Sequence, residues 1–162
     1  MKFSSKRSAY LAHCCSSRHK IREWELKIEE KYNLNLDNPF YDGNPNDIEV
    51  RNIKSLDETG KEIEKPTEYQ NYLVWKDLDR IIKSDFVIAI LDDNYSIGTH
   101  MEIFFARMVK KPVYCICLNK YAIEHSWIKY CSTQIFPDLK EFEIFLNIHK
   151  IINFQEMKYA IH

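Results

Sequence analysis

The sequence predicts an α/β fold in which helices cover a parallel sheet of about five strands. Two observations carry this prediction. Short apolar runs alternate along the chain with longer segments whose apolar residues recur at helical spacing. Residues 86–91 and 112–118 are almost continuously apolar and rich in β-branched side chains, which is typical of strands that are buried on both faces of a parallel sheet.

The first half of the chain starts with a short apolar strand at residues 8–13. Apolar residues at helical spacing then predict an amphipathic helix over residues 17–32. A second strand at residues 33–40 runs into a turn that contains proline. Residues 41–66 are polar and contain glycines and prolines, so we expect a long loop there, of the kind that often acts as a functional lid.

The second half continues the alternation. The expected elements are a helix at 67–84, a strand at 86–91, a helix at 99–110, a strand at 112–118, a short strand at 133–136 and a helix that Asp138 caps and that runs to about His149. We expect one domain over residues 1–150 and a C-terminal extension over residues 151–162.

Composition excludes several classes of function. The 162 residues carry 23 Lys and Arg against 24 Asp and Glu, a net charge of −1, which gives no support for binding a nucleic acid polymer or a membrane surface. No two of the three glycines lie close together, so a glycine-rich phosphate loop is absent. No apolar run approaches the roughly 18 residues that span a bilayer. The apolar segment at the N-terminus is too short for a signal peptide, so we expect a cytoplasmic protein.

The five cysteines form no CxxC pair, which leaves zinc ribbons and thioredoxin-like motifs unsupported. Cys115 and Cys117 alternate within an apolar run, and we expect them to be buried, reduced thiols. The sequence shows no cluster of metal ligands, so we expect neither a metal nor a cofactor.

In an open parallel sheet, ligands bind beyond the carboxyl ends of the strands, and polar residues follow four of the predicted strands there. They are Tyr10, His13, Ser16, Ser17 and Arg18 after the first strand, Asn38 and Phe40 after the second, Asp92, Asp93, Asn94, Ser96 and residues 98–102 after the third, and Glu124, His125, Ser126 and Trp127 after the fourth.

Glu102 has two interpretations. Thr99-x-x-Glu102 matches the capping box, in which the hydroxyl and the carboxylate bond the first amides of a helix. Alternatively, Glu102 is a nucleophile, because an ionised carboxylate at a strand–helix junction can attack an anomeric carbon and form a glycosyl ester.

An ordered set of short motifs resembles the nucleoside 2-deoxyribosyltransferase family and covers roughly residues 8–146. The motifs are Tyr10-Leu11-Ala12, Asp77-Leu78-x-x-Ile81-x-x-Ser84-Asp85, Gly98-Thr99-x-Met101-Glu102-Ile103-x-x-Ala106, Lys111-Pro112-Val113-Tyr114, His125-x-Trp127-Ile128 and Ile135-Phe136. The resemblance implies a flavodoxin-like, Rossmann-like three-layer sandwich. It also implies an enzyme that exchanges or hydrolyses the N-glycosidic bond of 2′-deoxynucleosides, with Glu102 as the nucleophile and the capping box as its positioning device.

The resemblance assigns roles to further residues, each with a structural alternative. It implies that Tyr10 hydrogen-bonds near the nucleophile, where a core aromatic is the alternative, and that Asp77 contacts substrate, where a solvated helix face is the alternative. Asn38 and Phe40 would line the base pocket or be buried turn residues. Met101 would lie beside the nucleophile or fill the core.

One position departs from the transferases. Their motif carries an aspartate six residues before the glutamate, where it helps to hold the sugar hydroxyl, and this chain has Ser96 there. A serine at this place resembles the deoxynucleoside 5′-monophosphate N-hydrolases, in which it contacts the phosphate. In that branch a serine placed like Ser126 reaches the phosphate from a neighbouring subunit.

The sequence leaves open whether the basic side chains near the end of the first strand bind a substrate phosphate. Arg18 and Arg22 would bind a phosphate or be exposed helix charges. His13 and His125 would move protons near neutral pH or play structural roles.

Three functions remain open at this stage. The first is transfer of deoxyribose between bases in nucleotide salvage, the second is hydrolysis of a deoxynucleoside 5′-monophosphate, and the third is a nucleotide-binding module without turnover. The expected partners are a nucleoside or its 5′-monophosphate and a free nucleobase. The resemblance further implies a homo-oligomer whose neighbouring subunits share active sites. Trp127, Ile128 and the apolar residues of the C-terminal tail would suit its interface.

Overall fold

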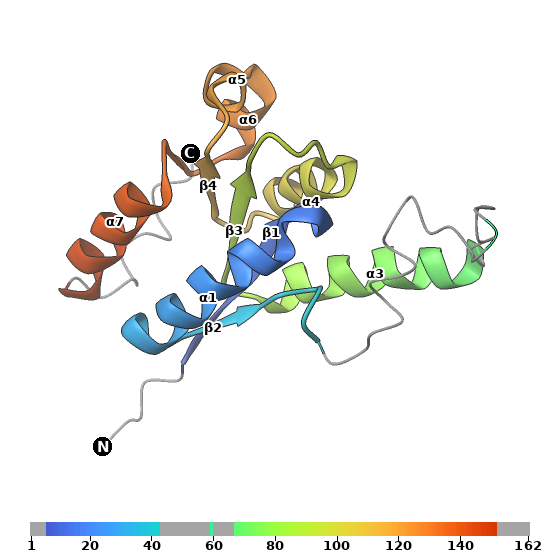
Figure 1. The fold of residues 1–162 in the computed structure, drawn as a ribbon, viewed down its shortest axis with the longest axis horizontal. Coiled ribbons are helices and arrows are strands. Elements are labelled where there is room, and N and C mark those ends of the chain that lie inside the picture. Colours follow the sequence, from blue (N-terminus) through green and yellow to red (C-terminus); the bar gives the residue numbers. More distant parts are fainter. Residues whose placement is uncertain (1–5, 43–58, 60–66, 152–162) are drawn as a thin grey trace.

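The computed structural model describes residues 6–42, 59 and 67–151, and its strands and helices alternate as the sequence predicted (Figure 1). Most of the expected 41–66 loop and residues 152–162 of the expected extension lie outside the described residues. The elements are β1 (Arg7–His13), a 3₁₀ helix η1 (Cys15–Ser17), α1 (Arg18–Tyr32), β2 (Leu34–Asp37), α3 (Thr67–Lys83), β3 (Phe86–Leu91), α4 (Ile97–Met108), β4 (Val113–Cys117), α5 (Lys120–Glu124), α6 (Ser126–Cys131), β5 (Gln134–Phe136) and α7 (Leu139–Ile151).

The five strands form one parallel sheet in the order β2-β1-β3-β4-β5, which confirms the predicted fold class. Tyr10 in β1 pairs with Asp37 on one side and with Val87 on the other. The strand order reverses between β1 and β3, and the carboxyl ends at such a switch point form the usual ligand crevice of open α/β sheets.

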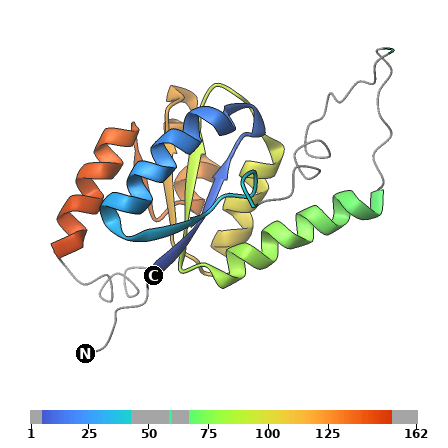
Figure 2. The ribbon, with the colours of Figure 1, turned by 60° about the horizontal axis from the view of Figure 1, so that its bottom comes forward.

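Helices cover both faces of the sheet (Figures 1 and 2). On one face α1 and α7 pack on a core that includes Leu11, Ile88 and Ile116. On the other face residues of α3, α4 and α6 pack on a core that includes Tyr10 and Val87. The first turns of α3 project beyond the sheet in both views. The layers therefore place Tyr10 on the face that carries α3 and α4.

The structure departs from the sequence-based elements at three places. Helix α4 begins at Ile97, two residues earlier than predicted. The second strand ends at Asp37, because the Asn38 side chain and carbonyl oxygen bond the Phe40 and Tyr41 amides and turn the chain out of the ladder. The short helices α5 and α6 were not predicted. Asp138 accepts the Glu141 amide at 2.8 Å, as expected for the cap of α7.

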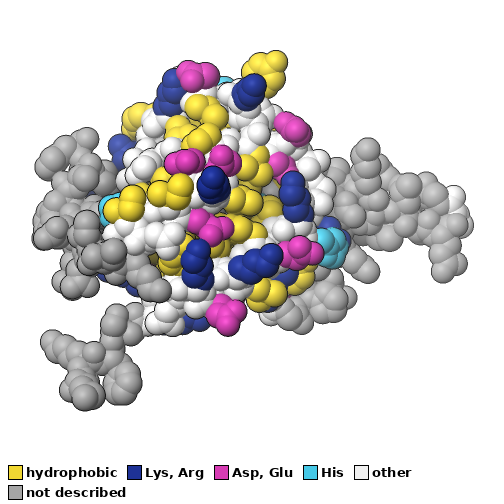
Figure 3. All heavy atoms as spheres, turned by 60° about the vertical axis from the view of Figure 1, so that its left-hand side comes forward, with side chains coloured by type: hydrophobic (Ala, Val, Ile, Leu, Met, Phe, Trp, Pro, Cys, Tyr) yellow, Lys and Arg dark blue, Asp and Glu magenta, His cyan; other side chains and the backbone are white. Residues whose placement is uncertain are grey.

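Buried thiols and mixed surface charge agree with the composition. Cys115 and Cys117 are buried and carry free thiols, as predicted. On the face shown in Figure 3, basic and acidic side chains are interspersed rather than gathered by sign. Within the described ranges, none of the helices has the length and apolar character needed to cross a bilayer.

Candidate active site

A hydrogen bond between β1 and α4 joins the two residues that the family resemblance linked to the chemistry. The Tyr10 hydroxyl donates to Glu102 Oε1 at 2.8 Å, across 92 positions of sequence. Tyr10 is fully buried in the sheet, and Glu102 is half-buried on the second turn of α4. The carboxylate is therefore held from behind by a rigid strand while it remains partly open to solvent.

Glu102 does not cap α4, so the predicted capping box is wrong. The N-cap is Ser96, whose backbone is extended and whose Oγ accepts hydrogen bonds from Thr99 N at 3.2 Å and Thr99 Oγ1 at 3.0 Å. Thr99 is thus a donor inside the first turn, and Glu102 lies about one turn further along the helix. Ser96, and not Glu102, therefore provides the side-chain cap of α4.

Ser96 and Gly98 shape the start of this helix. The Ser96 hydroxyl accepts two hydrogen bonds and still carries one proton that it can donate to a ligand. A Cβ built on Gly98 would meet only Ser96 Oγ, at 3.8 Å, an ordinary contact. Packing within the described residues therefore does not require glycine at position 98, and the helix start is open to a close approach by a ligand.

Asp77 belongs to a buried group of charges between α3 and the end of β2. It is 5% exposed, so the solvated-face alternative is wrong. Its neighbour on the next turn, Arg80, also faces Asp37 and Asp42. Burial raises the pKa of Asp37, an effect that the nearby Arg80 guanidinium opposes. The sheet register places Asp37 beside Tyr10, so this charge group adjoins the Tyr10–Glu102 pair.

His13, Asn38 and Phe40 were predicted to touch substrate, and the structure places all three inside the protein. They are 2%, 4% and 7% exposed, respectively. His13 Nε2 lies 3.2 Å from Asn38 Oδ1, and the His13 ring meets the Phe40 ring edge-on at 4.8 Å. Asn38 Nδ2 donates to Glu25 Oε2 at 2.6 Å. Asn38 Oδ1 also accepts the Phe40 amide at 3.0 Å, and this bond fixes the turn after β2.

Two ionisable groups in this interior network have shifted pKa values. Burial lowers the pKa of His13 to about 4, although its bonds to Cys14 O and Asn38 and the Asp92 carboxylate oppose the shift. Burial also raises the pKa of the fully buried Glu25, which pairs with Arg22. A neutral His13 ring donates only one proton, and we assign it to Nδ1, which lies closer to its partner, Cys14 O, at 3.0 Å.

A second polar network ties the first and third strand ends together, and the sequence analysis did not identify it. Ser17 Oγ donates to Asp92 Oδ2 at 2.5 Å, and Asn94 donates its side-chain amide to Ser17 Oγ and its backbone amide to Asp92 Oδ1. Asp92 is therefore a structural acceptor. Its place after the third strand was the only signal in the sequence.

Two residues after β1 that were predicted to bind substrate, Ser16 and Arg18, bond to residues of the preceding loop. Arg18 Nη1 donates to Cys15 O at 2.9 Å, and Ser16 Oγ lies 3.0 Å from Cys14 Sγ. Arg22 pairs with the buried Glu25 and is not a simple exposed charge. The exposed Ser126 begins α6.

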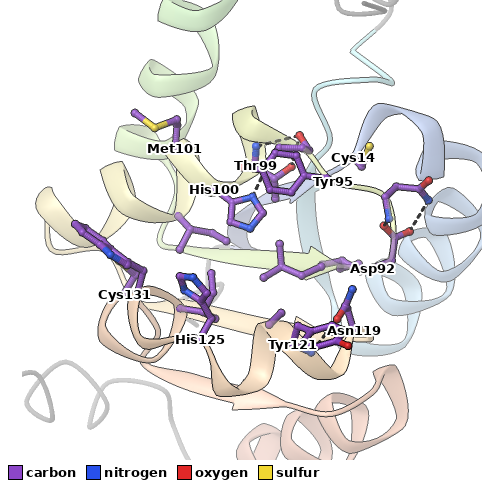
Figure 4. Close-up of a pocket in the computed structure, with 18 of the residues that line it drawn as sticks. Cys14, Asp92, Tyr95, Thr99, His100, Met101, Asn119, Tyr121, His125 and Cys131 are labelled. Carbon is purple, nitrogen blue, oxygen red and sulfur yellow. Dashed lines mark hydrogen bonds between the residues drawn. The ribbon is translucent and has the colours of Figure 1, made fainter.

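A cavity of about 560 Å³ lies between α4 and the α5–α6 segment (Figure 4). Ser96, His100 and Phe104, spaced four residues apart on α4, line one wall, and His125 and Trp127 lie on the other side. Glu102 is not among the lining residues, because it lies about 200° around the helix from His100. The cavity and the Tyr10–Glu102 pair thus occupy opposite flanks of α4.

Three residues that line this cavity test earlier predictions. Met101 is 59% exposed, so it does not fill the core, and Trp127 is 60% exposed. Ile128, predicted to suit an interface with Trp127, is buried within the subunit instead.

Comparisons with known proteins find this fold in solved enzymes. A 2-deoxyribosyltransferase from the psychrotolerant bacterium Bacillus psychrosaccharolyticus is 18% identical, with a TM-score of 0.64 over 93% of this chain and 95% of the other. The CMP N-glycosidase BcmB of Clostridium botulinum is 19% identical, with a TM-score of 0.54 over 88% of this chain and 99% of the other. A scan against family models and a search of curated proteins each return no match. The chain therefore has the Rossmann-like fold of a deoxyribosyltransferase and of a CMP N-glycosidase.

Proposed function

We propose that this protein cleaves the N-glycosidic bond of a 2′-deoxynucleoside or its 5′-monophosphate, with Glu102 as the nucleophile, and transfers the deoxyribose to a second base. The observation that carries the proposal is the 2.8 Å hydrogen bond from Tyr10 to Glu102, on a carboxylate that caps no helix. The motif resemblance and the names of the two structural neighbours, a deoxyribosyltransferase and an N-glycosidase, support the same bond as the target.

The reaction is a double displacement. A Glu102 oxygen attacks C1′, the C1′–N bond breaks, and its electron pair leaves with the base, which takes up a proton. This forms a glycosyl ester on Glu102. A ring nitrogen of the second base then attacks C1′ and breaks the ester bond, which restores the carboxylate, and the proton that this nitrogen loses balances the one that the first base took up. The Tyr10 hydrogen bond orients the carboxylate in both steps.

Hydrolysis of a deoxynucleoside 5′-monophosphate is the second candidate, and Ser96 favours it. A neutral serine caps α4, whose first turn contains no acidic residue, so the helix N-terminus favours an anion. In that case water replaces the second base as the acceptor. Asp92 and Asp93, which follow β3, oppose a phosphate nearby and favour an uncharged nucleoside.

We further propose that the protein acts in the cytoplasm, in nucleotide salvage, and as a homo-oligomer with shared sites. The support for association is the exposed apolar side chains on α4 and α6, including Met101, Met108, Trp127 and Tyr130. Size-exclusion chromatography with light scattering tests it, and a monomer at working concentration would rule out shared sites.

The Glu102→Gln variant tests the nucleophile, because glutamine keeps an oxygen that accepts the Tyr10 hydroxyl but does not form the ester. Deoxynucleosides and their monophosphates are incubated with each protein, with and without a second base, and the products are separated by chromatography. We expect base release to fall by at least about a thousandfold, as for loss of a covalent nucleophile. Glu124→Gln, an exposed carboxylate paired with Lys129, is the matched control.

The acceptor dependence separates the two candidate reactions. Product that forms only when a second base is present indicates transfer, and free sugar phosphate from the monophosphate indicates hydrolysis. Full activity of Glu102→Gln with an unchanged melting temperature would refute the assignment of the nucleophile. Ligand-induced thermal stabilisation without any base release would instead indicate a binding module.

A further inference from the structure

The guanidinium of Arg80 faces three carboxylates, one from each nitrogen. Nε lies 3.6 Å from Asp37 Oδ2, Nη2 donates to Asp42 Oδ2 at 2.9 Å, and Nη1 lies 3.9 Å from Asp77 Oδ1. The Cβ of a helical residue tilts towards the helix N-terminus, so this side chain reaches back over the turn that holds Asp77. Arg80 is 16% exposed and Asp77 is 7% exposed at the side chain.

One nitrogen of this guanidinium lacks a hydrogen bond. Arg80 Nη1 is buried and has no hydrogen-bond partner in the described part of the structure, because 3.9 Å is too long for a bond to Asp77. A buried donor without a partner is uncommon, since it loses its bonds to water and gains nothing in return. Nη1 has almost no exposed surface in this structure, and a ligand atom that reached it once the covering side chains moved aside would satisfy it.

Arg80 lies beside the residues of the proposed chemistry. Asp37, which its Nε faces, is the sheet partner of Tyr10, and neighbouring strands lie about 4.8 Å apart. Tyr10 in turn holds Glu102. The Arg80 guanidinium and the Tyr10–Glu102 pair therefore occupy the same face of the sheet, where α3 and α4 pack against each other.

This position matters for the bond that breaks. When Glu102 attacks C1′, the electron pair of the C1′–N bond moves onto the departing base, which becomes more negative. A cationic donor fixed beside the base stabilises that charge more than it stabilises the neutral substrate. Every nucleobase has a ring nitrogen or carbonyl acceptor next to an N–H group. Arg80 Nη1 as donor and the Asp77 carboxylate as acceptor match such an edge.

We propose that Arg80 is a catalytic residue for the leaving group: its Nη1 donates a hydrogen bond to the departing nucleobase, while Asp77 accepts a hydrogen bond from the neighbouring N–H of the same base. This inference rests on the proposed function, and it assigns the base to the side of α4 that faces α3. The competing explanation is that Arg80 is only a structural clamp for Asp42, which Lys76 also binds at 2.5 Å.

Substrates with different leaving groups separate the two explanations. One matched pair is 2′-deoxyuridine and 5-fluoro-2′-deoxyuridine, in which the fluorinated base is the stronger acid and leaves with less help. The other pair is 2′-deoxyguanosine and 7-methyl-2′-deoxyguanosine, whose base leaves without becoming an anion. The kcat/KM of the wild type, Arg80→Met and Arg80→Lys is measured for whichever pair the wild type cleaves better.

We expect Arg80→Met to lose at least about tenfold more activity on the ordinary substrate than on its activated partner, as for removal of a charge-assisted donor in a transition state. Arg80→Lys, which keeps the charge, is expected to recover part of that difference. Asp42→Asn weakens the clamp and leaves Nη1 in place, so it is expected to lower both rates by the same factor.

Equal losses on both substrates in Arg80→Met would overturn the leaving-group role and leave the proposed function standing. Arg80→Lys provides the same comparison if the methionine variant does not fold, as judged by circular dichroism. A wild type that releases no base from any of the four substrates would overturn the proposed function and this inference together.

Discussion

His13 is the titrating group whose effect on stability follows most directly from the structure. The ring is 2% exposed at the end of β1, and burial lowers its pKa to about 4. The unfolded chain has an ordinary histidine pKa of about 6.5. Between these two values the unfolded state binds more protons than the folded state, so stability falls as the solution becomes more acidic.

The size of this effect follows from the two pKa values. The stabilisation is fully present above about pH 6.5 and is lost as the pH falls towards 4. At about 1.4 kcal/mol for each pH unit, roughly 2–3 kcal/mol of unfolding free energy disappears between about pH 7.5 and 4.5. Glu25 contributes with the opposite sign: burial raises its pKa, so its contribution is present in acid and is lost as the pH rises through that pKa.

Urea unfolding of the wild type and of His13→Gln at about pH 7.5 and 4.5 measures the contribution of His13 to the free energy of unfolding, since every other group titrates in both proteins. We expect the variant to be less stable at neutral pH but to lose about 2–3 kcal/mol less than the wild type on acidification. His125→Gln removes an exposed histidine and serves as the control. If the wild type and His13→Gln lose the same stability, the argument that burial holds His13 neutral is wrong.

Two further predictions concern the helix cap and the thiols. Ser96→Ala removes the acceptor for the Thr99 amide. We expect the free energy of unfolding to fall by about 1 kcal/mol, which corresponds to a fall of about 2–4 °C in melting temperature. An unchanged melting temperature by differential scanning calorimetry would argue against the cap. Burial raises the pKa of Cys115 to about 12 and of Cys117 to about 11. We therefore expect a thiol reagent such as dithionitrobenzoate to label only the partly exposed Cys14 and Cys15 in the native protein at pH 8. Rapid labelling of Cys115 or Cys117 before unfolding would contradict this prediction.

The strands and long helices were predictable because the pattern of apolar residues within each segment indicates which positions are buried. Phe86–Leu91 is apolar at every position and is buried at every position, since helices cover both faces of the sheet. The short helices α5 and α6 carry too few residues for a periodic pattern. Asn119, whose side chain accepts the Tyr121 amide, was the one readable signal for the start of α5.

The Tyr10–Glu102 pair was foreseen only through the family motifs, because a hydrogen bond across 92 residues leaves no local pattern. The interior carboxylate of Glu25 had a signal that the sequence analysis did not use. Ile21, Trp24 and Ile28 define the buried stripe of α1, and Glu25 falls within it, where a charged residue is expected only if it has partners. Arg80 gave only the i, i+3 spacing from Asp77 as a local signal, because Asp37 and Asp42 lie far from it in the sequence.

The start of α4 decides what Glu102 can do. A helix that started at Thr99 would direct the Glu102 carboxylate to its own backbone amides, and the side chain would be structural. Ser96 takes the cap instead, which moves the start of the helix to Ile97 and places Glu102 about one turn inside. A carboxylate there has no helix amide to accept, so its anchor comes from elsewhere, and Tyr10 on β1 supplies it. The Ser96 cap thus determines which group anchors the Glu102 carboxylate.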